Sequence, residues 1–169
     1  MIFDFEPWKL DIDVDATREQ YRNKECNRNI NLTNKVIQLL SKDQKDFFTS
    51  LSVDISKADM KENIYDFPEE NPPEKTLSIQ IRFMMCGRFS AIPEFQNELY
   101  WEGDEKIFID RFPTDLNVVN ASNGEYFATY NVDTMAVIFK HPITSIQNEK
   151  FKKWECGYVL GEAIIKVEL

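Results

Sequence analysis

Three aspartates in the segment Asp11–Asp15 have the spacing of metal-binding side chains. They occupy alternate positions, like the first three acidic ligands of an EF-hand calcium loop. Such a loop also needs glycine at its sixth position and a bidentate glutamate at its twelfth, where this chain has Ala16 and Arg22. The residues between the aspartates are apolar, which is typical of a strand with one solvated face. We therefore expect no metal site here.

His141, the only histidine of the chain, and Cys86 are the candidates for proton transfer or nucleophilic attack. An imidazole with a pKa of about 6.5 can act as a general base, and His141 follows an apolar run that predicts a strand. A reactive cysteine needs basic neighbours, and Arg82 and Arg88 share the strand face of Cys86. The alternative is that His141 lies in an exposed loop and that Cys86 is a small buried apolar residue.

A segment rich in aromatic and acidic residues occupies positions 100–105. Aromatic side chains among polar ones are enriched at protein-binding surfaces. We predict a binding site made of five residues of this segment: Tyr100, Trp101, Glu102, Asp104 and Glu105. A core position for Trp101 is the alternative.

The chain lacks the motifs that specify a cofactor or a reaction. It contains no GxGxxG, no P-loop, no GxSxG and no HExxH, and its three cysteines form no CxxC pair. We therefore predict no cofactor, leave catalysis open and favour a protein that is not an enzyme.

The acidic balance of the chain restricts its partners. Its 20 lysines and arginines against 29 aspartates and glutamates give a net charge of −9. This charge disfavours binding to nucleic acid and to anionic membranes, and it permits a basic protein as partner. The first residues lack the features of a secretory signal, no apolar run reaches about 18 residues, and the odd, widely spaced cysteines are typical of reduced thiols. We expect a cytoplasmic protein.

The segment Leu77–Met85 gives the clearest structural prediction. Its odd-numbered residues are all large and apolar, and the residues between them are mostly polar. Because successive side chains of a strand point to opposite faces, this alternation predicts a strand with one face on the core. Gly87, shortly after it, indicates a bulge or a bend.

A strand and several helices are predicted before this segment. The run Trp8–Val14 alternates like a strand, and a Thr-x-x-Gln capping box predicts a helix that starts near Thr17. The apolar stripe Leu32–Leu40 and a second capping box at Ser41 predict two helices joined by a tight turn. We expect this helical hairpin to span residues 32–51.

Other segments carry weaker patterns. Residues 66–75 are rich in proline and acidic side chains and predict an exposed loop. The apolar run Met135–Phe139 predicts a central strand covered on both faces. The run 157–169 fits a helix or a strand, and its β-branched residues and two glycines favour a strand. Further patterns predict a helix at 93–99, strands at 107–112 and 126–130, and a helical turn at 149–154.

Together these segments predict a single domain of the α+β class over residues 1–169. We expect a mostly antiparallel sheet of about five or six strands. The N-terminal helical hairpin should pack on one face of this sheet.

Three functions are compatible with this fold. The first is a protein-binding module for a basic partner, such as an immunity or inhibitor protein, because opposite charges speed association. The second is a small-molecule-binding or enzymatic domain with a pocket near Arg82, Cys86 and His141. The third is a structural subunit of a homo-oligomer that pairs through a sheet edge.

Replacing Ile81 by aspartate tests the assignment of faces in the segment Leu77–Met85. An unpaired charge in the core costs several kcal/mol, so Ile81→Asp should abolish soluble expression. Gln80→Asp, on the other face, should be mild. Soluble yield and thermal unfolding measure the difference, and equal yields of the two variants would contradict the assignment.

Overall fold

A computed structural model describes residues 1–6, 8–67, 74–91, 118–120, 126–128, 130–140 and 157–168. Its elements are, in chain order, β1 (Ile2–Phe5), β2 (Trp8–Ile12), α1 (Val14–Asn23), α2 (Ile30–Leu39), α3 (Lys42–Ser50), the 3-10 helix η1 (Ile55–Lys57), β3 (Asp59–Phe67), β4 (Glu74–Ala91), β5 (Val118–Asn120), β6 (Tyr126–Ala128), β7 (Tyr130–Val132), β8 (Met135–Lys140) and β9 (Tyr158–Glu168). The α+β class predicted from the sequence is confirmed.

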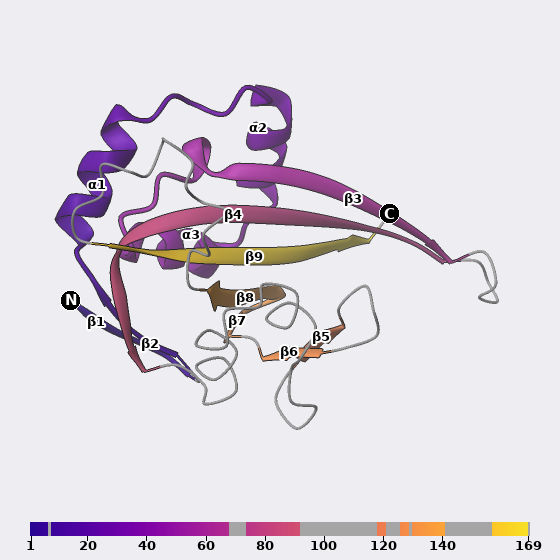
Figure 1. Cartoon of the computed structure of the whole chain (residues 1–169). Helices are drawn as coiled ribbons and strands as arrows, with labels where there is room; N and C mark the ends of the chain where they lie inside the picture. Colours follow the sequence, from indigo (N-terminus) through magenta and orange to yellow (C-terminus); the bar gives the residue numbers. More distant parts are fainter. Residues whose placement is uncertain are drawn as a thin grey trace, which may run out of the picture.

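The main sheet is antiparallel and is built around β4. It has seven strands, in the order β1-β2-β4-β9-β8-β7 with β3 as an additional partner of β4 (Figure 1). β9 pairs along one edge of β4. The other edge is shared by β3, which pairs with the first half of β4, and β2, which pairs with its last residues. A second sheet consists of β5 and β6.

The alternation within β4 is the one predicted. Leu77 is 5% exposed, and the following odd-numbered residues through Met85 are at most 1% exposed. The strand is longer than the predicted segment, with 18 residues from Glu74 to Ala91. Within the predicted segment, two residues of the opposite face, Ser78 and Met84, are buried as well. That face is therefore drier than the polar residues in the pattern indicate.

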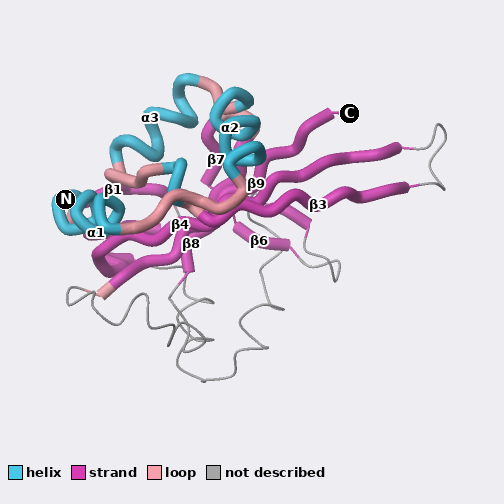
Figure 2. The backbone as a smooth tube through the Cα atoms, turned by 90° about the horizontal axis from the view of Figure 1, so that it is seen from above, coloured by secondary structure: helices cyan, strands magenta, loops and turns pink. Residues whose placement is uncertain are grey.

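The helices lie on one face of the sheet (Figure 2). α2 and α3 form the predicted hairpin, and Ser41 caps α3 through a reciprocal capping box with Gln44. Aromatic rings fill the interface, where the centroids of Phe48 and Phe83 are 5.2 Å apart. The ring of Phe83 lies against Gly161 of β9, so closely that a Cβ at this position would collide with it. Within the described residues, no helix is both long and apolar enough to cross a membrane.

The first helix begins before the predicted start at Thr17. α1 starts at Val14, and the carboxylate of Asp13 caps it by accepting a backbone N–H of the first turn at 2.9 Å. The predicted strand therefore ends at Ile12 rather than at Val14. The prediction was wrong because Asp13, which continues the alternation, is also a good helix cap, and periodicity alone cannot separate these two roles.

β4 changes its partner next to Gly87. β3 pairs with β4 as far as Arg82, and β2 pairs from Gly87 onward, where β4 curves toward β2 (Figure 1). Gly87 has a φ of +154°, and a Cβ there would collide with the backbone oxygen of Asp11 in β2. Only glycine allows this conformation and this close approach of the two strands.

A stretch of β4 between β3 and β2 takes its hydrogen bonds from α1. The N–H of Met84 donates to the hydroxyl of Tyr21 at 3.1 Å, and the N–H of Cys86 donates to the hydroxyl of Thr17 at 2.9 Å. The carbonyl of Cys86 accepts from the N–H of Asp13 at 2.9 Å. Burial raises the pKa of Tyr21 above its usual range, so the hydroxyl stays protonated. α1 therefore replaces a strand along this buried edge.

The strands predicted at the C-terminal run and at Met135–Phe139 are confirmed. β9 is the strand that the C-terminal run favoured over a helix. β8 contains the run Met135–Phe139, and its neighbours Val137 and Ile138, which point to opposite faces, are both buried. The run predicted as one strand at 126–130 contains β6 and the first residue of β7, which belong to different sheets.

The loop predicted at 66–75 is wrong at both ends. β3 continues to Phe67 and β4 begins at Glu74, and these two residues are paired. Acidic residues at the ends of β3 and β4 still pair in the ladder, so composition placed the ends of the loop too far apart. Residues 68–73 lie outside the described residues, as do the helix predicted at 93–99, the strand at 107–112 and the helical turn at 149–154.

Removing either hydroxyl that α1 offers to β4 should destabilise the protein. Tyr21→Phe and Thr17→Val each leave a buried N–H without its acceptor, which costs about 1–3 kcal/mol. Chemical denaturation measures the change in the free energy of unfolding. Tyr130→Phe, which removes the hydroxyl of a half-buried tyrosine in β7, is the control and should change it little. An equal loss in all three variants would refute the role of α1.

Candidate functional site

The binding residues predicted from the sequence lie outside the described residues. These are Tyr100, Trp101, Glu102, Asp104 and Glu105, and the same holds for His141. Their roles stay predictions.

Arg82 and Cys86 do not form a common site. Cys86 is 1% exposed and forms no disulfide with a described residue. The side chain of Arg82 is 57% exposed, and its Nε lies 3.5 Å from the carboxylate of Glu162. Four residues of extended strand separate the two by roughly 13 Å. They are too far apart to hold one small polar group between them.

Glu162 is a charged side chain in the middle of the sheet that sequence reasoning missed. It lies on β9, and its side chain is 8% exposed. Its carboxylate accepts a hydrogen bond from the amide of Gln80 and pairs with Arg82, both on the neighbouring β4. The available signal was a single acidic residue inside the apolar C-terminal run. Because these side chains hold one another in place, the cluster has the form of a structural ion pair.

This cluster changes the outcome expected for Gln80→Asp. Gln80 is half-buried and donates to Glu162, so aspartate would remove the donor and place a second carboxylate beside the first. We now expect Gln80→Asp to destabilise the protein, because like charges in a buried site repel. Ser90, an exposed residue of β4, is the better control position for Ile81→Asp.

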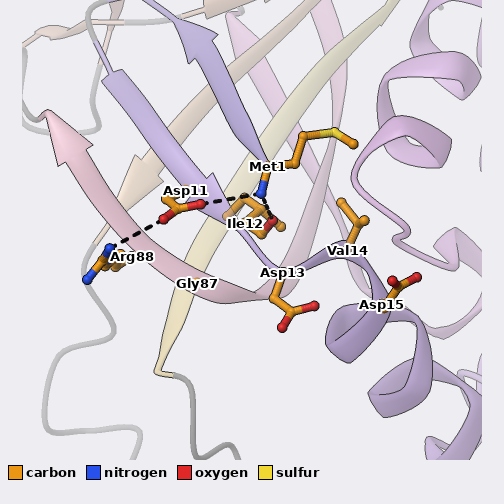
Figure 3. Close-up of a pocket in the computed structure, with 8 residues that line it drawn as sticks. All are labelled: Met1, Asp11, Ile12, Asp13, Val14, Asp15, Gly87 and Arg88. Carbon is orange, nitrogen blue, oxygen red and sulfur yellow. Dashed lines mark hydrogen bonds and ion pairs between the residues drawn. The ribbon is translucent and has the colours of Figure 1, made fainter.

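A pocket of about 440 Å³ opens at the N-terminal end of α1 (Figure 3). It contains the three aspartates of the segment Asp11–Asp15 together with Gly87 and Arg88. Asp11 lies 3.4 Å from Arg88 and 3.3 Å from the amino group of Met1. Asp13 caps α1, and Asp15 pairs with a basic residue of the same helix at 2.6 Å. The carboxylates are thus already bonded to groups of the chain itself.

No metal centre is formed within the described residues. No group of three or more histidine, cysteine, aspartate or glutamate side chains there is placed to hold a metal ion.

β3 forms an exposed edge of the sheet. Among the described strands it pairs only with β4, and the hairpin of β3 and β4 extends beyond the helices (Figures 1 and 2). Ile64 in this strand is 64% exposed. A long edge strand with an exposed apolar side chain can pair with another chain. This edge is therefore a candidate binding surface.

α2 is joined to this edge by an ion pair and carries an exposed apolar residue of its own. Nζ of Lys35 is 2.8 Å from the carboxylate of Glu62 in β3. Leu39, 44% exposed, follows Lys35 by one turn on the same side of α2. Ile64 follows Glu62 on the same face of β3. We call these four residues the α2–β3 surface: two exposed apolar side chains next to an ion pair.

Comparison with known proteins adds no relative. The chain matches no protein-family model, no curated protein and no solved structure. Its function is therefore inferred from its own geometry and charge.

Proposed function

We propose that this protein is a binding module for a basic protein and that the α2–β3 surface takes part in the binding. The observation that carries the proposal is the exposed edge of β3 with Ile64 on it. Lys35 of α2 reaches this edge through Glu62, and the exposed Leu39 lies one helical turn from Lys35. Exposed apolar side chains with charged groups at their rim are typical of protein-binding surfaces. The ion pair between Lys35 and Glu62 supplies such a rim.

The charge of the chain supports a basic partner. The net charge is −9, and β3 carries three acidic residues, Asp59, Glu62 and Asp66, against one lysine. The side chain of Asp59 is 78% exposed. Opposite charge speeds encounter and orients the two proteins. An acidic immunity or inhibitor protein that neutralises a basic toxin or enzyme binds it through this attraction between opposite charges.

A cytoplasmic location is part of the proposal. Cys26 is an exposed, free cysteine. An exposed thiol persists most readily in a reducing compartment. This supports the proposal that the protein is cytoplasmic.

A pocket for a small molecule near Arg82 and Cys86 has less support. Cys86 is buried and Arg82 is engaged by Glu162. We therefore keep the protein-binding proposal as the conclusion.

Capture of a partner from the host lysate tests this function. The tagged protein should retain a basic protein at low salt and release it as salt screens the charges. The double variant Leu39→Lys/Ile64→Lys removes both apolar groups and adds positive charge, so it should bind the same protein at least about tenfold more weakly. Titration calorimetry with the purified partner measures this ratio.

Ile2→Lys is the matched control. Ile2 is 57% exposed and lies on β1, another strand of the sheet, so this variant should bind like the unchanged protein. If the control loses as much affinity as the double variant, the α2–β3 surface is not the binding site. If no basic protein is retained at low salt, the proposed function is wrong.

A further inference from the structure

The hydrogen bonds of β4 show which of its backbone groups point toward β3. The N–H groups of Met84 and Cys86 point to α1, on the edge that β3 and β2 share. The N–H of Gly87 points the other way and donates to the carbonyl of Gly157, next to β9, at 3.2 Å. Because these directions alternate along a strand, the backbone N–H and C=O groups of the even-numbered residues of β4 point toward β3.

The register then fixes the outward groups of β3. Gln80 and Ser78 of β4 are opposite Lys61 and Asn63 of β3, within an unbroken ladder of nine pairs. In an antiparallel pair, residues that exchange hydrogen bonds alternate with residues whose N–H and C=O point away. The odd-numbered residues of β3 therefore bond to β4. The even-numbered ones direct their N–H and C=O groups outward: Met60, Glu62, Ile64 and Asp66.

These outward groups form an open row. Within the described part of the chain, no backbone hydrogen bond outside the ladder with β4 involves any of these four residues. The side chains of Glu62 and Ile64 are exposed, so water reaches this edge. Alternate residues of a strand are about 6.8 Å apart, which is the spacing at which an added strand makes its hydrogen bonds.

We propose that the edge of β3 binds an extended basic segment of the partner protein as an additional strand. This inference rests on the proposed function and specifies how the partner is held. The backbone of the segment would pair with the outward N–H and C=O groups of β3, as in other cases of strand addition. Its apolar side chains would contact Ile64 and Leu39, and its basic side chains would meet the acidic residues of β3.

Charge favours such a segment over a second copy of this chain. Two copies would each carry a net charge of −9 and would bring together two β3 strands that each have three acidic residues and one lysine, and this repulsion opposes their pairing. A segment with lysine or arginine at alternate positions gains attraction from the same field.

Two substitutions at Ile64 separate backbone pairing from side-chain contact. Ile64→Pro removes an N–H that points away from β4, so the existing ladder remains. Ile64→Thr removes the apolar bulk and keeps the N–H. The probe is a nine-residue peptide of alternating lysine and valine, and the captured basic protein is tested in parallel. Ile64→Pro should weaken binding at least about tenfold, and Ile64→Thr at most about threefold. Equal losses would overturn strand addition and leave protein binding in place.

Hydrogen exchange gives a readout that needs no variant. In the free protein, the amides of Glu62 and Ile64 should exchange fast and those of Lys61 and Asn63 slowly. The peptide should protect Glu62 and Ile64, and a peptide with glutamate in place of lysine should not. Binding without this protection would refute strand addition. Protection without peptide, together with a dimer in light scattering, would identify a second copy as the occupant and overturn the proposal. Absence of any basic ligand would refute the proposed function as well.

Discussion

The structure depends on the way α1 completes the hydrogen bonding of β4. β4 pairs with two strands along one edge, β3 as far as Arg82 and β2 from Gly87 onward. The β4 residues between these two positions pair with neither strand. These residues are buried, so water cannot satisfy their N–H groups. The hydroxyls of Thr17 and Tyr21 do so instead. An N–H left unpaired there would cost a large part of a typical net stability. The packing of α1 thus allows β4 to pair with both β3 and β2 along one edge of the seven-stranded sheet.

The same alternation of hydrogen bonds links this core feature to the exposed edge. The backbone N–H and C=O groups of even-numbered residues in β4 point to α1 in the gap and to β3 beyond it. This direction determines which residues of β3 turn their backbone groups outward. The gap in β4 and the edge of β3 differ in their surroundings. The gap in β4 is buried and is closed by a helix of the chain itself, whereas the edge of β3 lies beside the exposed Ile64, where water satisfies its groups. A buried edge must be closed within the fold, and a solvated edge remains available to a partner.

The charged side chains show how one residue type takes different roles in this fold. The aspartates of the segment Asp11–Asp15 have the spacing of calcium ligands, yet Asp13 caps α1 and the other two pair with basic groups. Glu162 stands alone in an apolar run and is held inside the sheet by Gln80 and Arg82. In each case the neighbours decide the role, and most of these neighbours come from other elements.

The sequence by itself determined the elements whose signals are local. The alternation in Leu77–Met85 identified a strand and its buried face, because side-chain direction follows backbone geometry. The capping box at Ser41 located the start of α3, because its hydrogen bonds join residues only three positions apart. Only the tertiary structure decided that Glu162 is buried and that β3 is an open edge. These features depend on groups far apart in the chain, and such pairings leave no periodic signal in the sequence.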